Sequence, residues 1–292
     1  MPHAQSPPLI HPTAIIEPGA QLAPDVAVGA YAYIGPRVKL GPGCVVFHHA
    51  CIEGDTTAGS NNQFFPFCTI GGIPQDLKYR GGHCTLDIGD SNTFREYASV
   101  HVGTEDGGGA TKIGAGNLLM AHAHIAHDCI LADRCILANN VMIAGHCQID
   151  DWAVISGGSG LTHFVSVGQH AFVGGVLAIL RDVPPFTMFG GAPTAVRGIN
   201  RVGLKRRKFP PETLDALKTA YRILYCQNMP VTAGIRQLRE MFPSNAQVGH
   251  MLDFIERSAQ GKSGRYLESQ RGKTPWTDPN STDEKGADDD DI

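Results

Sequence analysis

The sequence predicts a parallel β-helix solenoid followed by a helical region, and two columns of residues are the main reason. From Ile113 to Val173 a branched aliphatic residue occupies every sixth position without a break. The fourth residue after each aliphatic is small or compact, except Leu177 at the end of the stretch. Helices place apolar residues three and four apart, and half-buried strands place them two apart. A period of six fits a solenoid in which each hexad forms one flat face and three hexads close a coil.

Composition narrows the class of protein. The 292 residues allow one large or two modest domains, and the net charge of −4 argues against a nucleic-acid partner. The chain has no run of eighteen apolar residues and no charged-then-apolar leader over Met1–Leu9. We therefore expect no membrane span and no secretory signal, which favours a cytoplasmic location.

The cysteines follow the repeat. Five of the eight occupy the small-residue position of a hexad, and no two are spaced as CxxC: Cys44, Cys68, Cys129, Cys135 and Cys147 are the five. We interpret them as small buried apolar groups, with disulfides or metal ligation as the alternatives.

The N-terminal half keeps the same count from Ile10 to Ile52 and continues it less regularly to Ile70. Glycine often follows the aliphatic residue, as at Gly29, Gly35 and Gly41. This placement predicts corners of the coil at which the backbone needs a positive φ.

Two stretches interrupt the repeat. The first is 71–87, after which Ile88 resumes the count eighteen residues beyond Ile70, which is the length of one coil. The second, 101–112, contains three consecutive glycines and shifts the phase by one residue. Insertions in a solenoid form loops on one face, often the binding face. We expect the first to be a functional loop, and tolerated surface decoration is the alternative.

The repeat is predicted to end near Ile179, before Pro184 and Pro185. Apolar residues at helical spacing then predict helices over 211–225, 231–241 and 248–258, which would cover the open end of the solenoid. The predicted organisation is a β-helix domain over 1–190, a helical domain over 191–260 and a polar, acidic, disordered tail over 261–292.

Four histidines suggest where chemistry occurs: His122, His124, His127 and His146. Residues eighteen apart are neighbours in stacked coils, so Gly145 lies above His127 with His163 above it, and His146 lies beside Asp128. A histidine base, a carboxylate and a bare backbone amide are what acyl transfer to a hydroxyl requires. Two alternatives remain, namely histidines lining a trimer seam and a zinc site like that of trimeric β-helix carbonic anhydrases.

Two segments of the chain are specific enough to indicate a family, Gln75–Tyr79 and Ala123–Asp128. Together with a similarity that covers about residues 10–260, they resemble the UDP-N-acetylglucosamine 3-O-acyltransferase family, whose reaction starts lipid A synthesis. It implies a left-handed parallel β-helix, assembled as a homotrimer with active sites between subunits. It also implies transfer of a 3-hydroxyacyl group from acyl carrier protein to the glucosamine 3-hydroxyl of UDP-N-acetylglucosamine. No metal or other cofactor is implied.

The resemblance also implies roles for particular residues. His127 matches the general base, Asp128 its partner and Gly145 the oxyanion amide. Gly175 matches the residue that sets acyl length, and a glycine there implies room for a longer chain. The substrate-binding positions are matched by Gln75, Asp76, Lys78, His124, His146, His163, Asn200 and Arg206.

Two positions depart from the family pattern. Thr162-His163 stands where the family commonly has His-Gln, and His122 stands where asparagine is common. The alternative functions are therefore acyl transfer to a 3-amino sugar, later N-acylation, a trimeric zinc hydratase and a non-catalytic scaffold. The basic run Lys205–Lys208 is expected to contact phosphate or the acidic carrier protein, or to be a solvated helix face.

Overall fold

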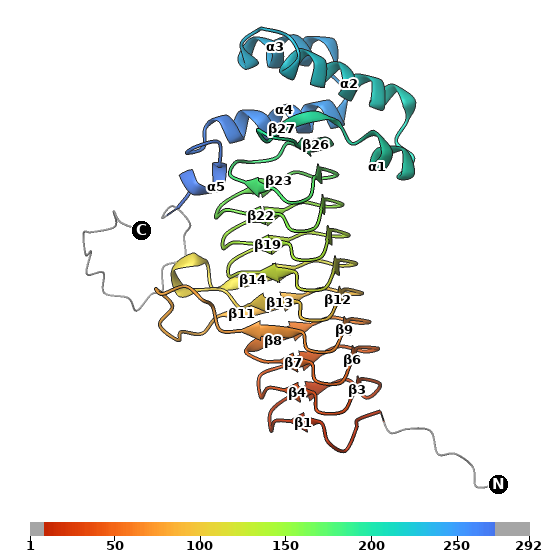
Figure 1. Cartoon of the computed structure of the whole chain (residues 1–292), viewed down its shortest axis with the longest axis vertical. Coiled ribbons are helices and arrows are strands. Elements are labelled where there is room, and N and C mark those ends of the chain that lie inside the picture. Colours follow the sequence, from red (N-terminus) through yellow and green to blue (C-terminus); the bar gives the residue numbers. More distant parts are fainter. Residues whose placement is uncertain (1–8, 272–292) are drawn as a thin grey trace, which may run out of the picture.

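The computed structural model describes residues 9–271, which form a long three-sided prism with helices at its C-terminal end (Figure 1). Three sheets make the sides of the prism, and we name them A (ten strands), B (nine strands) and C (eight strands). Each coil passes from sheet B to sheet C to sheet A. The prism therefore has three edges, which we call the B–C, C–A and A–B edges.

Most strands are only two residues long, as a six-residue repeat with three corners requires. Sheet A contains β3 (Ala27–Val28), β6 (Val45–Val46), β9 (Gln63–Phe64), β12 (Thr93–Phe94), β15 (Leu118–Leu119), β18 (Ile136–Leu137), β21 (Val154–Ile155), β24 (Phe172–Val173), β26 (Thr187–Gly190) and β27 (Ala195–Ile199). Sheet B contains β1 (Ile15–Ile16), β4 (Tyr33–Ile34), β7 (Cys51–Ile52), β10 (Thr69–Gly72), β13 (Ser99–His101), β16 (His124–Ile125), β19 (Met142–Ile143), β22 (Gly160–Leu161) and β25 (Ala178–Ile179). Sheet C contains β2 (Gln21–Leu22), β5 (Lys39–Leu40), β8 (Asp55–Ala58), β11 (Thr85–Ile88), β14 (Ala110–Ile113), β17 (Ile130–Leu131), β20 (Gln148–Ile149) and β23 (Ser166–Val167).

The register confirms the predicted columns. Ile125 pairs with Ile143, and His124 with Met142, in parallel strands eighteen residues apart. The second residue of nearly every strand points into the prism and is buried, and the small-residue column fills the corners beside it. The five cysteines of that column are buried, as their position in the repeat predicts, and all eight cysteines are free thiols.

The corners turn at a different residue from the one that we predicted. Positive φ occurs three residues after the aliphatic, for example at His122, Asp128 and His146, all with φ near 60°. Gly29, Gly35 and Gly41 are not left-handed, and the expectation of positive φ there is wrong. A Cβ on Gly29 or Gly41 would lie within 3 Å of the backbone of the next coil, and a Cβ on Gly35 would lie 3.2 Å from Glu53 Cα, so close packing favours glycine at all three positions.

Both interruptions leave the prism at the B–C edge and enlarge one coil each. Ala58 pairs with Ile88, so the coil that contains the first interruption has thirty residues in place of eighteen. Ile88 pairs with Ile113, so the coil that contains the second interruption has twenty-five residues. The eighteen residues from Ile70 to Ile88 are thus one face and a loop, and not the full coil that their number suggested.

Buried asparagines join the enlarged coils. The Asn62 side-chain carbonyl accepts from the backbone and side-chain N–H groups of Asn92, at 2.9 and 3.0 Å. The Asn92 carbonyl accepts from the N–H of Asn117, whose own carbonyl accepts from the N–H of Cys135. All three asparagines are at most 1% exposed. This ladder replaces the small apolar residue of the repeat where the coils change length.

Helices cover the last coil. They are α1 (Arg201–Arg206), α2 (Pro211–Tyr225), α3 (Val231–Met241), α4 (Ala246–Ala259) and the short α5 (Tyr266–Ser269), with a 3-10 helix, η1 (Glu105–Gly107), in the second interruption. The three helices predicted from the sequence are confirmed as α2, α3 and α4. The β-helix continues past Ile179, because β26 adds a further parallel strand before β27 turns back antiparallel and ends the sheet. Phe186 packs under Leu217, Leu252 and the other apolar residues of the helical region.

The residues just after α4 are folded against the prism, whereas we assigned them to the tail. The buried Asp182 carboxylate accepts from the Tyr266 N–H at 3.0 Å, and the Arg265 guanidinium donates to the Leu180 carbonyl at 2.9 Å. These contacts explain why α5 forms in a polar stretch. The acidic part of the predicted tail, 272–292, lies outside the described residues. Among residues 9–271 no helix is both long and apolar enough to cross a membrane.

Candidate active site

The two interruptions meet beside each other on the B–C edge. The Arg80 guanidinium contacts the Asp106 carboxylate at 3.2 Å, and the Glu105 carboxylate accepts from the backbone N–H groups of Arg80 and Gly82. The first loop therefore rests on the second. Together they stand next to the coil that contains His127.

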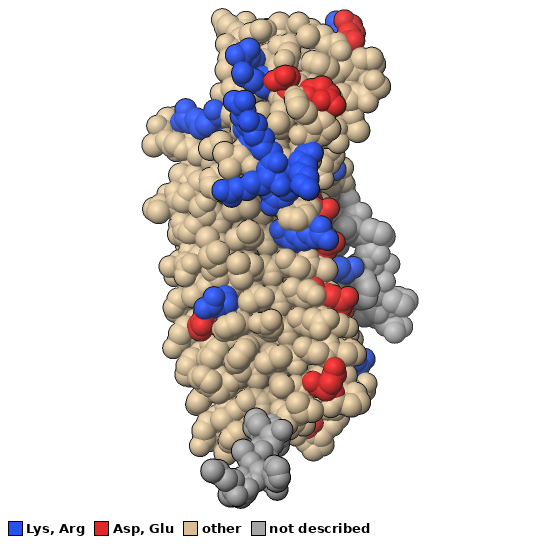
Figure 2. Space-filling model, turned by 90° about the vertical axis from the view of Figure 1, so that its right-hand side faces the viewer, with Lys and Arg blue, Asp and Glu red and all other residues tan. Residues whose placement is uncertain are grey.

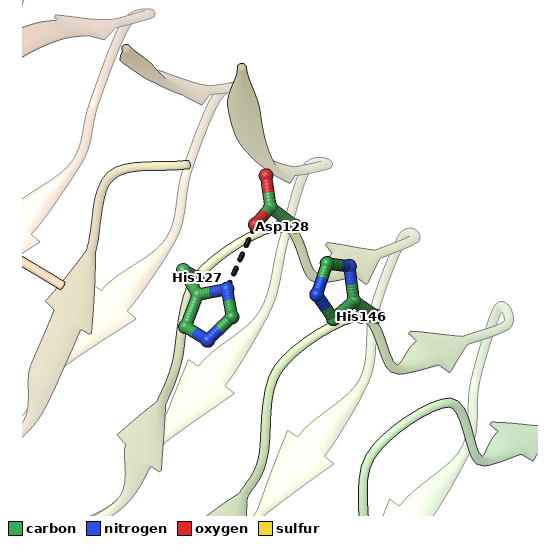
Figure 3. Close-up of side chains that lie close together, drawn as sticks. All are labelled: His127, Asp128 and His146. Atoms are coloured by element: carbon green, nitrogen blue, oxygen red, sulfur yellow. Dashed lines mark hydrogen bonds and ion pairs between the residues drawn. The ribbon is translucent and has the colours of Figure 1, made fainter. Parts of the chain in front are cut away.

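His127 and Asp128 form a buried pair at this edge (Figure 3). The two residues are 6% and 8% exposed, and the distance from His127 Nδ1 to Asp128 Oδ2 is 2.7 Å. Because an ionised carboxylate only accepts, Nδ1 carries the proton and Nε2 has a free lone pair. Asp128 sits at the left-handed corner with φ 58°, a conformation that aspartate tolerates. This corner brings the carboxylate back beside its neighbour's ring.

Three residues of the second interruption hold Asp128. Thr104 donates to the carboxylate from its hydroxyl (2.6 Å) and from its backbone N–H (3.0 Å). The Thr111 hydroxyl accepts from the Asp128 N–H at 2.8 Å. Gly107 lies so close that a Cβ there would be 2.1 Å from Oδ2. Sequence reasoning missed these positions, and the glycine run of the interruption was the available signal.

Gly145 lies directly against the His127 ring, as the eighteen-residue spacing predicts. A Cβ on Gly145 would be 2.5 Å from His127 Cε1 and 2.6 Å from Nε2. Within the described part of the chain the Gly145 N–H donates no hydrogen bond. A free amide donor therefore accompanies the imidazole, which is the geometry of an oxyanion site.

Further imidazoles line the same edge and are kept neutral by burial. The His146 ring is perpendicular to that of His127, with centroids 5.0 Å apart, and stacks on Phe164. Burial lowers the pKa of His146 to about 4, and it lowers the pKa of His163 as well. Neutral imidazoles can donate or accept a hydrogen bond without adding charge near the base.

His124 lies one face away, on sheet B. Its Nδ1 is 2.8 Å from the Ser99 hydroxyl, and its ring packs edge-on against His101 at 4.8 Å. Burial, together with the nearby His127, lowers the pKa of His124. His124 thus lies beside the edge without lining its cavity.

A cavity of about 250 Å³ opens next to the pair, between the interruptions and α5. Asp76 and Lys78 of the first loop line it, and Asp76 Oδ2 is 3.7 Å from His127 Nε2. Gln75 is exposed on the same loop. Leu267 and Arg271, which sequence reasoning did not single out, close the cavity from the C-terminal side.

Three predicted site residues lie on other edges of this chain. Gly175 adjoins the A–B edge, where a Cβ would be 3.1 Å from the Gly157 carbonyl. Asn200 lies at the C–A edge, donates to the His170 carbonyl at 2.9 Å and caps α1, which contains Arg206. A single chain therefore does not bring these three residues to His127.

The edge also has the composition of a metal site. One ligand atom each of His127, Asp128 and His146 lie within 4.8 Å of one another. Asp128 Oδ2, however, already accepts from His127 and Thr104. The hydrogen bonds thus use the carboxylate to orient the imidazole.

Comparison with known proteins establishes the family over most of the chain. The acyl-[acyl-carrier-protein]–UDP-N-acetylglucosamine O-acyltransferase of Xylella fastidiosa is 46% identical over 252 residues, which is 85% of this chain and 95% of that protein. This chain belongs to the UDP-N-acetylglucosamine O-acyltransferase family. The enzyme of the same name from Thiobacillus denitrificans is 44% identical over 86% of this chain and 98% of that protein.

Two family models support the assignment to the UDP-N-acetylglucosamine O-acyltransferases. The model described as "Udp N-acetylglucosamine O-acyltransferase; Domain 2" matches residues 182–263, and that of the bacterial transferase hexapeptide matches 110–145. The first match covers the helical cap, and the second covers the coils that contain His127 and Asp128. The cap match is specific to this family, and the hexapeptide match is consistent with it because it identifies the transferase repeat in general.

Solved structures of the same acyltransferase family share the fold. LpxA from Acinetobacter baumannii is 40% identical with a TM-score of 0.81, covering 84% of this chain and 96% of that one. LpxA from Bacteroides fragilis, a UDP-N-acetylglucosamine acyltransferase, is 34% identical with a TM-score of 0.82 and the same coverage. The predicted left-handed parallel β-helix with a helical C-terminal region is confirmed.

Proposed function

We propose that this chain transfers a 3-hydroxyacyl group from acyl carrier protein to the 3-hydroxyl of UDP-N-acetylglucosamine, the first step of lipid A biosynthesis. The single observation that carries this proposal is the buried His127–Asp128 pair with the free Gly145 N–H against its ring. The names of the Xylella and Thiobacillus relatives supply the substrates. The reaction is an acyl exchange between a thioester and an alcohol.

His127 is the general base of the proposed reaction. Its free Nε2 removes the proton from the sugar hydroxyl as the oxygen attacks the thioester carbonyl, and Asp128 stabilises the resulting imidazolium. The negative oxygen of the tetrahedral intermediate accepts a hydrogen bond from the Gly145 N–H. When the C–S bond breaks, the imidazolium returns its proton to the departing thiolate. Proton and charge balance without any added group.

The remaining polar residues of the B–C edge position the acceptor. Asp76 lies 3.7 Å from the reacting nitrogen, so a sugar hydroxyl bound to its carboxylate would lie within reach of Nε2. Lys78 and Gln75 of the same loop are placed for the sugar nucleotide. His124, His146 and His163 offer neutral imidazole donors and acceptors around it. The assignment of Asp76 follows from this distance, and the other assignments follow from the family resemblance.

The active unit that we propose is a homotrimer. The outward positions of the two-residue strands of sheets A and B carry no charged side chain, and the exposed Arg197 lies on β27 at the capped end of sheet A; sheet C exposes Lys39, Asp87 and Lys112. Sheets A and B meet at an edge where Tyr31, His49, Phe67, Tyr97 and His122 stack in a column, and Tyr31 and Tyr97 are more than half exposed. Exposed apolar surface of this extent is typical of an interface.

A ring of three copies would also complete the site. Packing face A of one copy against face B of the next is a heterologous contact that closes by rotation. Asn200, Arg206 and Gly175 lie away from His127 in their own chain, so they would serve a neighbour's site, contacting nucleotide and acyl chain. Native mass spectrometry should give three chains per particle, and a single chain would contradict this arrangement.

The donor is expected to dock beside the helical cap. Lysines and arginines gather where the cap meets the prism (Figure 2), and Arg201, Lys205, Lys218 and Arg222 line a hollow of about 510 Å³ there. A positive surface attracts an acidic carrier protein and steers its approach. The nearness of Arg201 and Lys205 to Asn200 places this surface next to the proposed nucleotide contacts.

A zinc hydratase is the second candidate, because His127, Asp128 and His146 could ligate a metal. It predicts one zinc per chain after purification without chelator, and loss of that zinc in His127→Ala. Full activity of zinc-free protein in the acyl-transfer assay would exclude a catalytic metal.

The deciding experiment incubates purified protein with UDP-N-acetylglucosamine and a ladder of 3-hydroxyacyl carrier proteins, with mass-spectrometric detection. We expect one acylated UDP-sugar, whose mass identifies the acyl length and tests Gly175. His127→Ala should lower turnover about 100- to 10,000-fold and leave the number of chains per particle unchanged in native mass spectrometry. The exposed His11→Ala is the matched control.

Other outcomes separate the alternatives. A product formed only from the 3-amino sugar would transfer the proposal to that acceptor. A product formed only from an already acylated sugar would indicate later N-acylation. Unchanged turnover in His127→Ala would contradict the assigned base, and no product from any acceptor would favour a scaffold.

A further inference from the structure

The segment after α4 contributes to the catalytic cavity, although it lies beyond the residues that the acyltransferase cap model matches. The match to the acyltransferase cap ends at residue 263, whereas Leu267, Gln270 and Arg271 line the cavity together with Asp128 and His146. In Figure 1 α5 lies on the same side of the prism as the two interruptions and closer to the helical cap. The wall of the cavity is therefore built from two distant parts of the chain.

Specific contacts fix this segment to the prism. The Asp182 carboxylate accepts from the Ser166 N–H with one oxygen (2.8 Å) and from the Tyr266 N–H with the other (3.0 Å). Arg265 donates to the Leu180 carbonyl and forms an ion pair with Glu268 on the next turn. Asp182 is 6% exposed, so its hydrogen bonds to the start of α5 are shielded from water. The position of α5 over the cavity is thus set by buried bonds.

Arg271 is one of two cations among the described residues that line the cavity, and Lys78 is the other. Within residues 9–271 Arg271 makes no ion pair, whereas Arg80 and Arg239 do. The charges of Arg265 and Arg271 also reach His163, where they add to burial in lowering its pKa. Burial lowers the pKa of His146 and of His163, which keeps these two imidazoles neutral, so they cannot balance an anionic ligand. The Arg271 guanidinium is therefore available to bind an anionic ligand.

We propose that α5 and Arg271 form part of the substrate site, with the Arg271 guanidinium binding a phosphate group and Leu267 packing against the adjoining carbon chain. A guanidinium binds phosphate through two parallel N–H bonds and stays protonated at all working pH values. The inference rests on the proposed function, because both of its substrates contain phosphate groups. These are the pyrophosphate of the sugar nucleotide and the phosphodiester of the carrier's pantetheine arm.

Steady-state kinetics of the full chain test this inference. Arg271→Ala should raise the KM for one substrate about 10-fold or more and change kcat little, as loss of a charge-assisted contact predicts. The substrate whose KM rises identifies the phosphate. Arg271→Lys keeps the charge but loses the paired N–H geometry, so its KM should lie between those of the wild type and of Arg271→Ala. Leu267→Ala should raise the KM for the same substrate.

Arg236→Ala is the matched control, since Arg236 is exposed on α3 and lines neither this cavity nor the hollow at the helical cap. Melting temperatures are measured for every variant. Unchanged KM values for both substrates in Arg271→Ala would overturn the inference, as would a lowered melting temperature with unchanged KM. Absence of turnover in the wild-type protein would instead contradict the proposed function itself.

Discussion

Gly145 shows how one absent side chain controls the position of the proposed base. Its backbone N–H donates no hydrogen bond among the described residues, and the His127 ring occupies the space that a Cβ would fill. Gly107 does the same for Asp128 from the opposite side. The imidazole and its carboxylate thus lie between two glycines and two threonines, which restricts both to one arrangement.

Gly145→Ala should lower kcat about 100-fold while the protein remains folded, because the new methyl group would displace the His127 ring from the reacting geometry. The backbone there is not left-handed, so alanine adds steric conflict and no backbone strain. Turnover and melting temperature are measured together. Gly249→Ala on α4, where a Cβ would meet nothing within 4 Å, is the control. Equal kcat in both variants would show that the ring does not need this space.

At the scale of the element, the coil tolerates insertions because its core continues on both sides of them. Both interruptions leave at the B–C edge, and the sheet register resumes after each. The buried asparagine ladder satisfies backbone groups whose partners change at these coils. Loop formation beside the site therefore requires a polar element inside the prism.

Asn92→Leu should lower the free energy of unfolding by about 3 kcal/mol or more, because several buried partners lose their hydrogen bonds at once. Asn92 donates to the Gly89 and Gly114 carbonyls as well as to Asn62. Chemical denaturation followed by circular dichroism measures the change. Asn228→Leu, at an exposed position between α2 and α3, should be close to neutral. A wild-type unfolding curve for Asn92→Leu would mean that the ladder contributes nothing.

For the whole molecule, buried histidines make stability depend on pH. Burial lowers the pKa of His101, His146 and His170 to about 4 each. Between pH 4 and 6.5 the unfolded chain therefore binds more protons than the folded one. Stability consequently rises with pH through this window and is lost as the pH falls.

Melting temperature should therefore decrease steadily from pH 6.5 to pH 4.5. His170→Phe should flatten part of this dependence, since His170 lies among Trp152, Phe186 and Phe209 at a left-handed corner, and phenylalanine occupies such corners elsewhere. The exposed His11→Phe is the control. A pH profile of His170→Phe identical to that of the wild type would show that this imidazole does not titrate in the window.

The sequence by itself determined the prism, its core and the central pair of the site. A strict period makes residues eighteen apart neighbours, so His127, Gly145 and His163 could be placed in one column without coordinates. The helices 211–225 and 231–241 were equally predictable from apolar spacing. The sequence pattern is enough to predict the structure where each unit repeats the same contacts.

Only the tertiary structure decided what surrounds that pair. The interruptions and the segment after α4 have no period, so nothing in their spacing indicates that Thr104 holds Asp128 or that Arg271 reaches the same cavity. The structure likewise separates Gly175 and Asn200 onto other edges, which family resemblance alone had grouped with His127. Contacts between distant parts of a chain depend on how its elements pack, and packing is a property of the whole fold.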